Sequence, residues 1–233
     1  MDRITDMSQK TYNDVIAQEP AASIKCQKLI SLDFETPKKY EEVVDIWYAT
    51  VEGSKFQAMK GQAVVNADIL TVLSEIHDLT ECTPAMPAEQ KDGKVCRYIY
   101  FPSDEVRANV QAIKDKSGVI EGNSYLCYQL IESPSAMISR REFYITKTTF
   151  DQSSGGVKKF VITQNNPEVD ITTAAKAVRG SMSSCIVLEA EGAKTKVTTY
   201  FHVDPMGSIP AMIFTGSLNK QNNFLVKLLK KFQ

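Results

Sequence analysis

The sequence has few of the residues from which metal sites and disulfide frameworks are built. Its 233 residues include five cysteines, which are scattered and never spaced C-x-x-C, and only two histidines. An odd number of distant cysteines does not fit a disulfide scaffold, and two histidines do not complete a zinc site. We therefore expect no metal and a reducing cytosol as the protein's compartment.

The sequence also lacks an excess of either charge and a long hydrophobic run. Lys and Arg number 27 against 28 for Asp and Glu, so no global positive field exists to hold nucleic acid. Residues 1–14 contain no signal-peptide core, and no charge-free apolar run approaches the ~18 residues of a membrane span. We expect a cytoplasmic protein without a nucleic-acid partner, and the 43% hydrophobic content suffices for a core.

Apolar residues at helical spacing predict helices in four parts of the chain. Residues 7–17 form a candidate opening helix that Pro20 would end. Two further helices are expected at 66–79, with Asn66 as N-cap, and at 104–114. The last, at the C-terminus, carries an apolar stripe on one side and lysines on the other.

Residues rich in β-branched and aromatic side chains predict the strands. A hairpin is expected over 43–65, and a short strand after residue 94. Five antiparallel strands then follow with short Gly- and Ser-containing turns, at 124–131, 142–150, 158–164, 181–191 and 194–204. The exception is residues 165–177, which are too long for a hairpin and have the composition of a functional loop.

Strands and helices that are segregated along the chain indicate an α+β fold. No repeat and no linker divides the sequence, so we expect a single domain over 1–233. Residues 1–23 would form a short N-terminal helix or arm, and 215–232 the C-terminal helix. A curved antiparallel sheet with this helix across its concave face either packs solid or encloses a ligand cavity.

Three segments carry a resemblance to a known family. Residues 139–147 read SRREFYITK, residues 178–180 read VRG, and residues 204–210 read DPMGSIP. In this order and spacing they resemble motifs of START (steroidogenic acute regulatory protein-related lipid transfer) domains. The likeness can be followed from about residue 43 to residue 232, and the last segment is the most specific.

The resemblance implies a helix-grip fold around an internal hydrophobic cavity for one lipid. The C-terminal helix would be its lid, and the loop at 165–177 would lie beside the mouth. Glu142 stands where the family usually has Asp, and residues 82–102 look inserted. Sterol-type members place an acidic residue and an Arg in the cavity, at positions aligned here with Gln129 and Lys147. Because that charged pair is absent, we do not name cholesterol as the ligand.

Candidate site residues follow from this alignment and from the apolar stripe. Those expected to line the cavity are Gln129, Phe143, Ile145, Lys147, Arg179 and Met212. Those expected in the lid helix and the gate are Leu218, Leu225, Leu228, Leu229, Asp170 and Ile171. Strand alternation leaves open which face of 142–147 lines the cavity. Arg179 fits either a head-group contact or a structural ion pair.

The function that the resemblance implies is non-catalytic. The protein would bind one lipid and transfer or sense it between membranes, as a monomer that contacts membranes transiently and needs no cofactor besides that lipid. No G-x-S-x-G, H-E-x-x-H, P-loop or G-x-G-x-x-G motif is present. Two alternatives stay open: a grip-fold enzyme using Glu142, Asp170 or His202, and a ligand-gated protein-interaction module without transfer.

Overall fold

A computed structural model of the chain describes residues 13–15, 17–80, 95–131, 139–168, 177–209 and 222–233. The helices in these ranges are α2 (Glu19–Ile30), α3 (Ile69–Thr80), α4 (Asp104–Lys114) and α6 (Asn223–Lys231). The strands are β1 (Lys38–Tyr40), β2 (Val44–Ala49), β3 (Ala58–Val65), β4 (Val95–Tyr100), β5 (Tyr125–Ile131), β6 (Arg140–Asp151), β7 (Lys159–Asn165), β8 (Ala177–Arg179), β9 (Ser181–Glu191) and β10 (Lys194–Asp204).

All ten of these strands belong to one sheet, which is antiparallel except at β8. Its order is β1-β2-β3-β10-β9-β7-β6-β5-β4, and β8 pairs in parallel with the start of β6. Strands β5 to β7 and then β9 and β10 follow one another as neighbours, as hairpins require. The α+β class and the antiparallel sheet expected from the sequence are confirmed.

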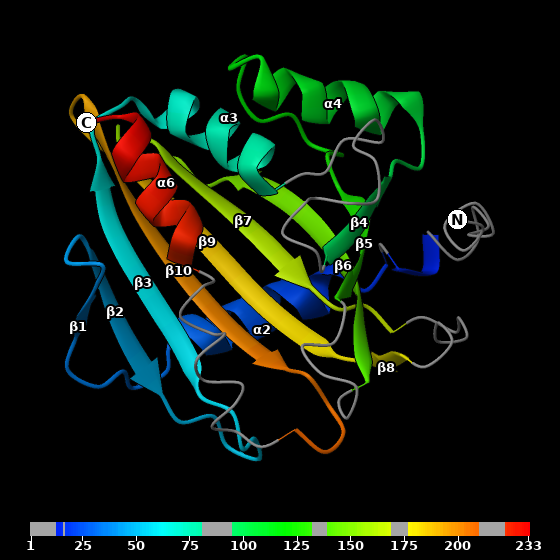
Figure 1. Cartoon of the computed structure of the whole chain (residues 1–233). Coiled ribbons are helices and arrows are strands. Elements are labelled where there is room, and N and C mark those ends of the chain that lie inside the picture. The colour runs from blue at the N-terminus through cyan, green and yellow to red at the C-terminus, as the bar shows by residue number, and fades with distance from the viewer. Residues whose placement is uncertain (1–12, 16, 81–94, 132–138, 169–176, 210–221) are drawn as a thin grey trace.

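Helices cover the two faces of the sheet (Figure 1). Helices α3 and α6 lie on the face toward the viewer, which we call the α6 face, and α2 crosses the opposite one, the α2 face. The main core fills the space under α3 and α6, where Leu225, Leu228 and Ile76 are fully buried against Ile162 and Ile186 of the sheet. The lysines of α6 point away from this core and are exposed, which explains the amphipathic pattern of the helix.

The N-terminal part differs from its prediction. Pro20 does not end a helix but lies in the first turn of α2, where its missing N–H would have no partner in any case. Residues 13–15 are helical, and the rest of the predicted opening helix up to residue 12 lies outside the described residues. Helix α2 was not predicted, and its Cys26 and Leu29 are buried against the α2 face.

The other predicted elements agree with the structure within a few residues at each end. Helix α3 is capped by Asp68 and not by Asn66: the Asp68 Oδ1 accepts hydrogen bonds from the backbone N–H groups of Leu70 (3.1 Å) and Thr71 (3.0 Å). The C-terminal helix is described from Asn223 onward, and its predicted first part lies outside the described residues. None of the described helices is both long and apolar enough to cross a membrane.

Candidate functional site

The register of the sheet decides which face each side chain of β6 occupies. Thr149 lies opposite Ile162, and Ile162 belongs to the core beneath α6. Side chains alternate along a strand, so Phe143, Ile145 and Lys147 share this α6 face with Thr149. The register therefore places Phe143, Ile145 and Lys147 on the face of the sheet that α6 covers.

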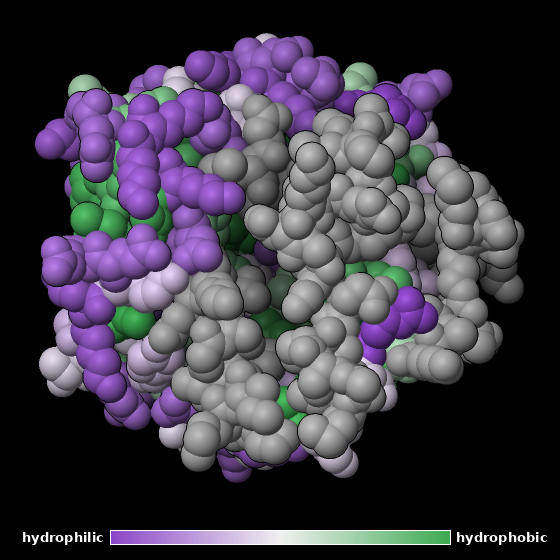
Figure 2. Space-filling view, viewed as in Figure 1, coloured by the Kyte–Doolittle hydropathy of each residue, from purple (hydrophilic) through white to green (hydrophobic). Residues whose placement is uncertain are grey.

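A group of apolar side chains lies on the α6 face beyond the part that α3 and α6 cover. Its buried members come from β6 and β10, its half-buried members from β5 and β9, and we call it the apolar patch: Phe143, Ile145, Val203, Cys127, Ile131 and Met182. In the space-filling view, hydrophobic surface is visible in a hollow over the middle strands of this face (Figure 2).

Three polar side chains adjoin the apolar patch in one line across the sheet. Lys147 on β6 lies opposite Gln164 on β7, and Gln164 lies opposite Ser184 on β9. We call these residues the polar row. Lys147 is only 2% exposed, and its ammonium group lies 5.7 Å from the ring centre of Tyr125. The α6 face thus has three parts: the main core, the polar row and the apolar patch.

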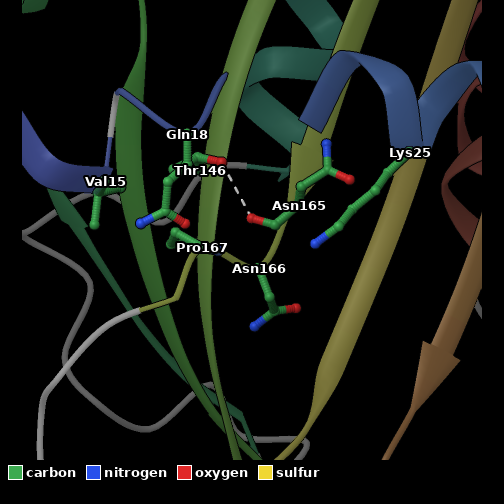
Figure 3. A pocket seen from close by; sticks show the side chains of 7 residues that line it. All are labelled: Val15, Gln18, Lys25, Thr146, Asn165, Asn166 and Pro167. Atoms are coloured by element: carbon green, nitrogen blue, oxygen red, sulfur yellow. Dashed lines mark hydrogen bonds between the residues drawn. The ribbon is translucent and has the colours of Figure 1, made fainter. Parts of the chain in front are cut away.

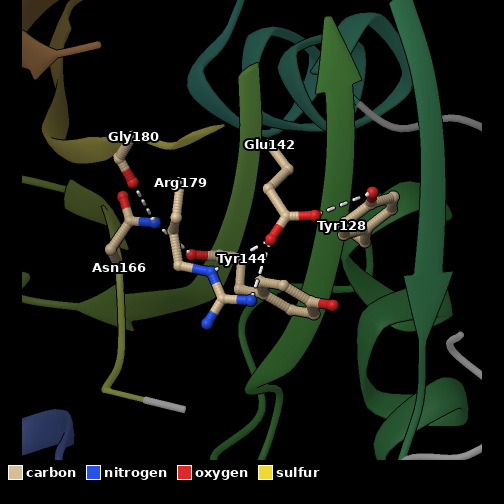
Figure 4. A network of polar contacts seen from close by, with 6 residues as sticks. All are labelled: Tyr128, Glu142, Tyr144, Asn166, Arg179 and Gly180. Atoms are coloured by element: carbon tan, nitrogen blue, oxygen red, sulfur yellow. Dashed lines mark hydrogen bonds and ion pairs between the residues drawn. The ribbon is translucent and has the colours of Figure 1, made fainter. Parts of the chain in front are cut away.

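Arg179 lies on the α2 face, where its side chain meets that of Glu142 on β6 (Figure 4). Its Nη2 is 2.8 Å from Oε1 of Glu142, whose side chain is fully buried. Tyr128 donates a hydrogen bond to the other carboxylate oxygen of Glu142 at 3.3 Å, and the guanidinium group lies 4.7 Å from the ring centre of Tyr144. The ion pair joins β8 to β6, so Arg179 has a buried carboxylate partner on the neighbouring strand.

Asn166 fixes the first residues after β7, where the predicted loop begins. Its amide Nδ2 donates to the carbonyl oxygen of Tyr144 at 2.7 Å, and its Oδ1 accepts from the backbone N–H of Met182. Gln18 donates to the carbonyl oxygen of Glu168 (3.0 Å) and accepts from its N–H (2.8 Å). Residues 166–168 are therefore held by contacts with β6, with β9 and with Gln18, the residue before α2.

A small pocket lies at the same place on the α2 face (Figure 3). Its volume is about 30 Å³, far below the roughly 300 Å³ or more of a typical ligand pocket, so a lipid does not fit in it. It is lined by Val15, Gln18, Lys25, Thr146, Asn165, Asn166 and Pro167.

Arg141 holds the turn that follows β10. Its Nε donates to the carbonyl oxygen of Pro205 at 2.5 Å and its Nη2 to that of Met206 at 3.0 Å. Asp204 accepts from the backbone N–H of Met206 at 2.7 Å, and burial lowers the pKa of Arg141 from its ordinary value. Arg141 of the SRREF segment is thus hydrogen-bonded to the backbone of the DPMGSIP segment.

The N-terminal end of α6 is seated on β3 and β10. The buried amide of Asn222 donates to the sulfur of Met59 at 3.4 Å and accepts from the hydroxyl of Thr199 at 3.3 Å. The rings of Phe224 on α6 and Phe201 on β10 meet edge to face, with centres 6.5 Å apart. Because Phe201 lies opposite Ser184, the seat of α6 borders the polar row.

The structure brings together part of the predicted site. On the α6 face of β5 and β6 it places Gln129, Phe143, Ile145 and Lys147. Leu225 and Leu228 are buried in the core under α6, and Leu229 packs against it. Met212, Leu218, Asp170 and Ile171 lie outside the described residues. Gln164 and Ser184 were not among the predicted site residues, because only strand register reveals their position beside Lys147.

No family model and no curated protein matches this sequence. The structure is similar to human StAR-related lipid transfer protein 5, with a TM-score of 0.63, 16% identity, and coverage of 94% of this chain and 97% of that chain. It is also similar to a STAR-related lipid transfer protein from Xanthomonas axonopodis (TM-score 0.60, 16% identity, 84% and 97% covered). A third similar structure is the lipid transfer and protein localization domain of human StarD13 (0.59, 14%, 91% and 95%). The START-like helix-grip fold is therefore confirmed.

Proposed function

We propose that this protein binds one lipid molecule in a cavity on the α6 face and transfers or senses it between membranes, without catalysing a reaction. The observation that carries the proposal is the apolar patch, a set of buried side chains on the part of the sheet not covered by α3 and α6. The names of the similar structures, which are lipid transfer proteins, support it at the level of the fold.

The physical requirement for such a function is a dry apolar site. A lipid exposes hundreds of Å² of hydrocarbon, and moving each Å² into water costs ~25 cal/mol. Carrying a lipid through water therefore needs an apolar cavity with a few polar groups that fix the polar end. The apolar patch supplies one wall of this kind, and the polar row supplies the polar groups beside it.

Opening of the C-terminal helix and of the loop at 165–177 would admit the lipid in this proposal. Leu225 and Leu228 seat the helix on the core, and the segment before it carries Met212 and Leu218. Asp170 and Ile171 belong to the loop, whose base Asn166 and Gln18 hold. We propose further that the protein acts in the cytoplasm as a monomer and contacts membranes transiently.

Two of the three residues that the enzyme alternative would use have partners in the structure, and the third, Asp170, lies outside the described residues. Glu142 is paired with Arg179, and the ring of His202 bonds to the hydroxyl of Ser54 at 3.1 Å. These contacts support the non-catalytic proposal over the enzyme alternative.

The test is to incubate the purified protein with a whole-cell lipid extract, re-isolate it, and identify the bound molecules by native mass spectrometry. One lipid class at one molecule per chain is the expected result. Absence of any retained lipid would overturn the proposal. The variant Ile145→Trp, which enlarges a side chain of the apolar patch, should lose the lipid while keeping its circular dichroism spectrum. Val157→Trp, at an exposed turn position, is the matched control and should retain it.

A further inference from the structure

We propose that the polar row binds the acyl carboxyl oxygens of the lipid, as a carboxylate or an ester carbonyl. This inference rests on the proposed function and names the chemistry of the ligand at the same site. It begins from three residues that are far apart in the sequence and share one line of the sheet: Lys147, Gln164 and Ser184.

Ser184 is the residue whose state points to a ligand. Its side chain is completely buried, and its hydroxyl oxygen makes no hydrogen bond in the part of the chain that the structure describes. Buried hydroxyl groups in folded proteins nearly always have a partner, so one without it needs an explanation. Ser184 lies between Gln164 and Phe201 on the α6 face, where the proposed lipid would lie.

Gln164 adds a second group to this position. Its neighbours Phe160 and Ile162 on the same face of β7 are buried in the main core, whereas Gln164 is half-buried. Its amide makes no side-chain hydrogen bond within the described ranges. The Gln164 amide can therefore bond to a ligand at the place where the main core ends and the apolar patch begins.

The chemistry of the row favours a ligand group that accepts hydrogen bonds. A glutamine amide has two N–H donors and one acceptor oxygen, and a serine hydroxyl has one donor and one acceptor oxygen. Gln164 and Ser184 thus present three donors and two acceptor oxygens, and a lysine ammonium such as that of Lys147 has donors only. Carboxylates and ester carbonyls are acceptors only, so they match this row, whereas a sterol presents a single hydroxyl that both donates and accepts.

The neighbourhood of the row fixes the orientation of such a lipid. On one side the sheet is filled by the main core under α3 and α6, and on the other side lies the apolar patch. The hydrocarbon chain would lie on Phe143, Ile145 and Val203, with the carboxyl oxygens at the row. A free fatty acid and a glycerolipid both present this chemistry, and the experiment separates them.

The test compares Ser184→Ala and Gln164→Leu with the parent protein. Binding is measured with sodium oleate, with dioleoylphosphatidylcholine vesicles and with cholesterol, each as a separate probe. Ser183→Ala is the matched control, because Ser183 is the next residue of β9 and its side chain lies on the α2 face. We expect the parent to bind oleate or the phosphatidylcholine, and the two row variants to raise that Kd by roughly fivefold to tenfold. Ser183→Ala should leave it unchanged.

The melting temperature of the lipid-free protein separates ligand contact from a structural role. Removing a hydroxyl that has no partner should leave the melting temperature of Ser184→Ala unchanged or slightly raised. If the parent binds lipid and neither row variant weakens that binding, the inference is overturned and the proposed function stands. If the parent binds cholesterol alone, the inference is likewise overturned and the proposed function stands. Parent protein that retains none of the three probes, nor any lipid from the extract, would overturn both.

Discussion

The seat of α6 on the sheet depends on the absence of a side chain at Gly61. A Cβ atom placed there would lie 2.8 Å from Oγ1 of Thr199 and 2.9 Å from Cγ of Asn222, and closer still to Oδ1 of Asn222. Real Cβ atoms do not approach other atoms so closely, so Gly61→Ala must displace the buried amide of Asn222. That amide holds the first turn of α6 to Met59 and Thr199.

The change in the free energy of unfolding that Gly61→Ala should cause follows from two opposing effects. Forcing an extra carbon into a packed site costs about 1–3 kcal/mol, while replacing glycine by alanine in a strand returns about 0.5–1 kcal/mol. Taken at their middle values, these terms predict that Gly61→Ala lowers the free energy of unfolding by about 1 kcal/mol. For a chain of this length that corresponds to a fall in melting temperature of roughly 2–4 °C.

The assay is a double-mutant cycle with Asn222→Ala, in which urea unfolding measures the stability of each variant. If the destabilisation by Gly61→Ala arises from the clash with Asn222, it should be smaller by about 1 kcal/mol in the Asn222→Ala background. The same variant should release a bound lipid faster, because the seat of α6 borders the polar row. An equal cost in both backgrounds, or no cost in the parent, would refute the reasoning.

Three further predictions concern helix α6, the buried ion pair and one histidine. Leu225→Asp buries an unpaired carboxylate, so it should lower the free energy of unfolding by about 3 kcal/mol or more and weaken lipid retention. The control Lys227→Asp, on the exposed side of α6, should lower it by under about 0.5 kcal/mol. Equal urea midpoints for the two variants would contradict this prediction. Arg179→Met should cost about 3 kcal/mol in chemical unfolding, because it leaves the carboxylate of Glu142 buried without its cation, and a loss below 1 kcal/mol would argue against a structural pair. Burial lowers the pKa of His202, so the unfolded chain binds a proton that the folded chain does not, and stability is lost as the pH falls below about 6.5. His202→Gln should therefore show a smaller fall in melting temperature between pH 7 and pH 5 than the parent, and parallel curves would count against this effect.

The strands were predictable because each is a short run of β-branched and aromatic residues between turn residues. Strands β9 and β10 have the predicted boundaries, since Gly192 between them fixes a tight turn with a positive φ of 63°. Helices α3 and α4 were predictable for the corresponding reason, an apolar stripe with a capping residue before it. Helix α2 escaped prediction because its buried residues are few and Pro20 was taken as an end instead of a beginning.

The face of β6 that lines the site was not predictable, because both faces of this strand are buried. Tyr144 packs on the α2 face with Leu126 and Tyr128, just as Phe143 and Ile145 pack on the other. Alternation tells the two sets apart only when one face is polar, and here it is not. Only the pairing of β6 with β7, and of β7 with the core under α6, resolves the ambiguity.

The polar row shows the same limit in a stricter form. A lysine, a glutamine and a serine in three separate strands are unremarkable in the sequence, since each strand also carries other polar residues. They become one group only because Lys147 lies opposite Gln164 and Gln164 lies opposite Ser184. A slip of one residue in β7 would send the Gln164 side chain to the α2 face and bring Thr163 or Asn165 into the row. The sequence motifs indicate the fold, whereas the proposed chemistry of the lipid rests on the pairing of distant strands, which the motifs do not contain.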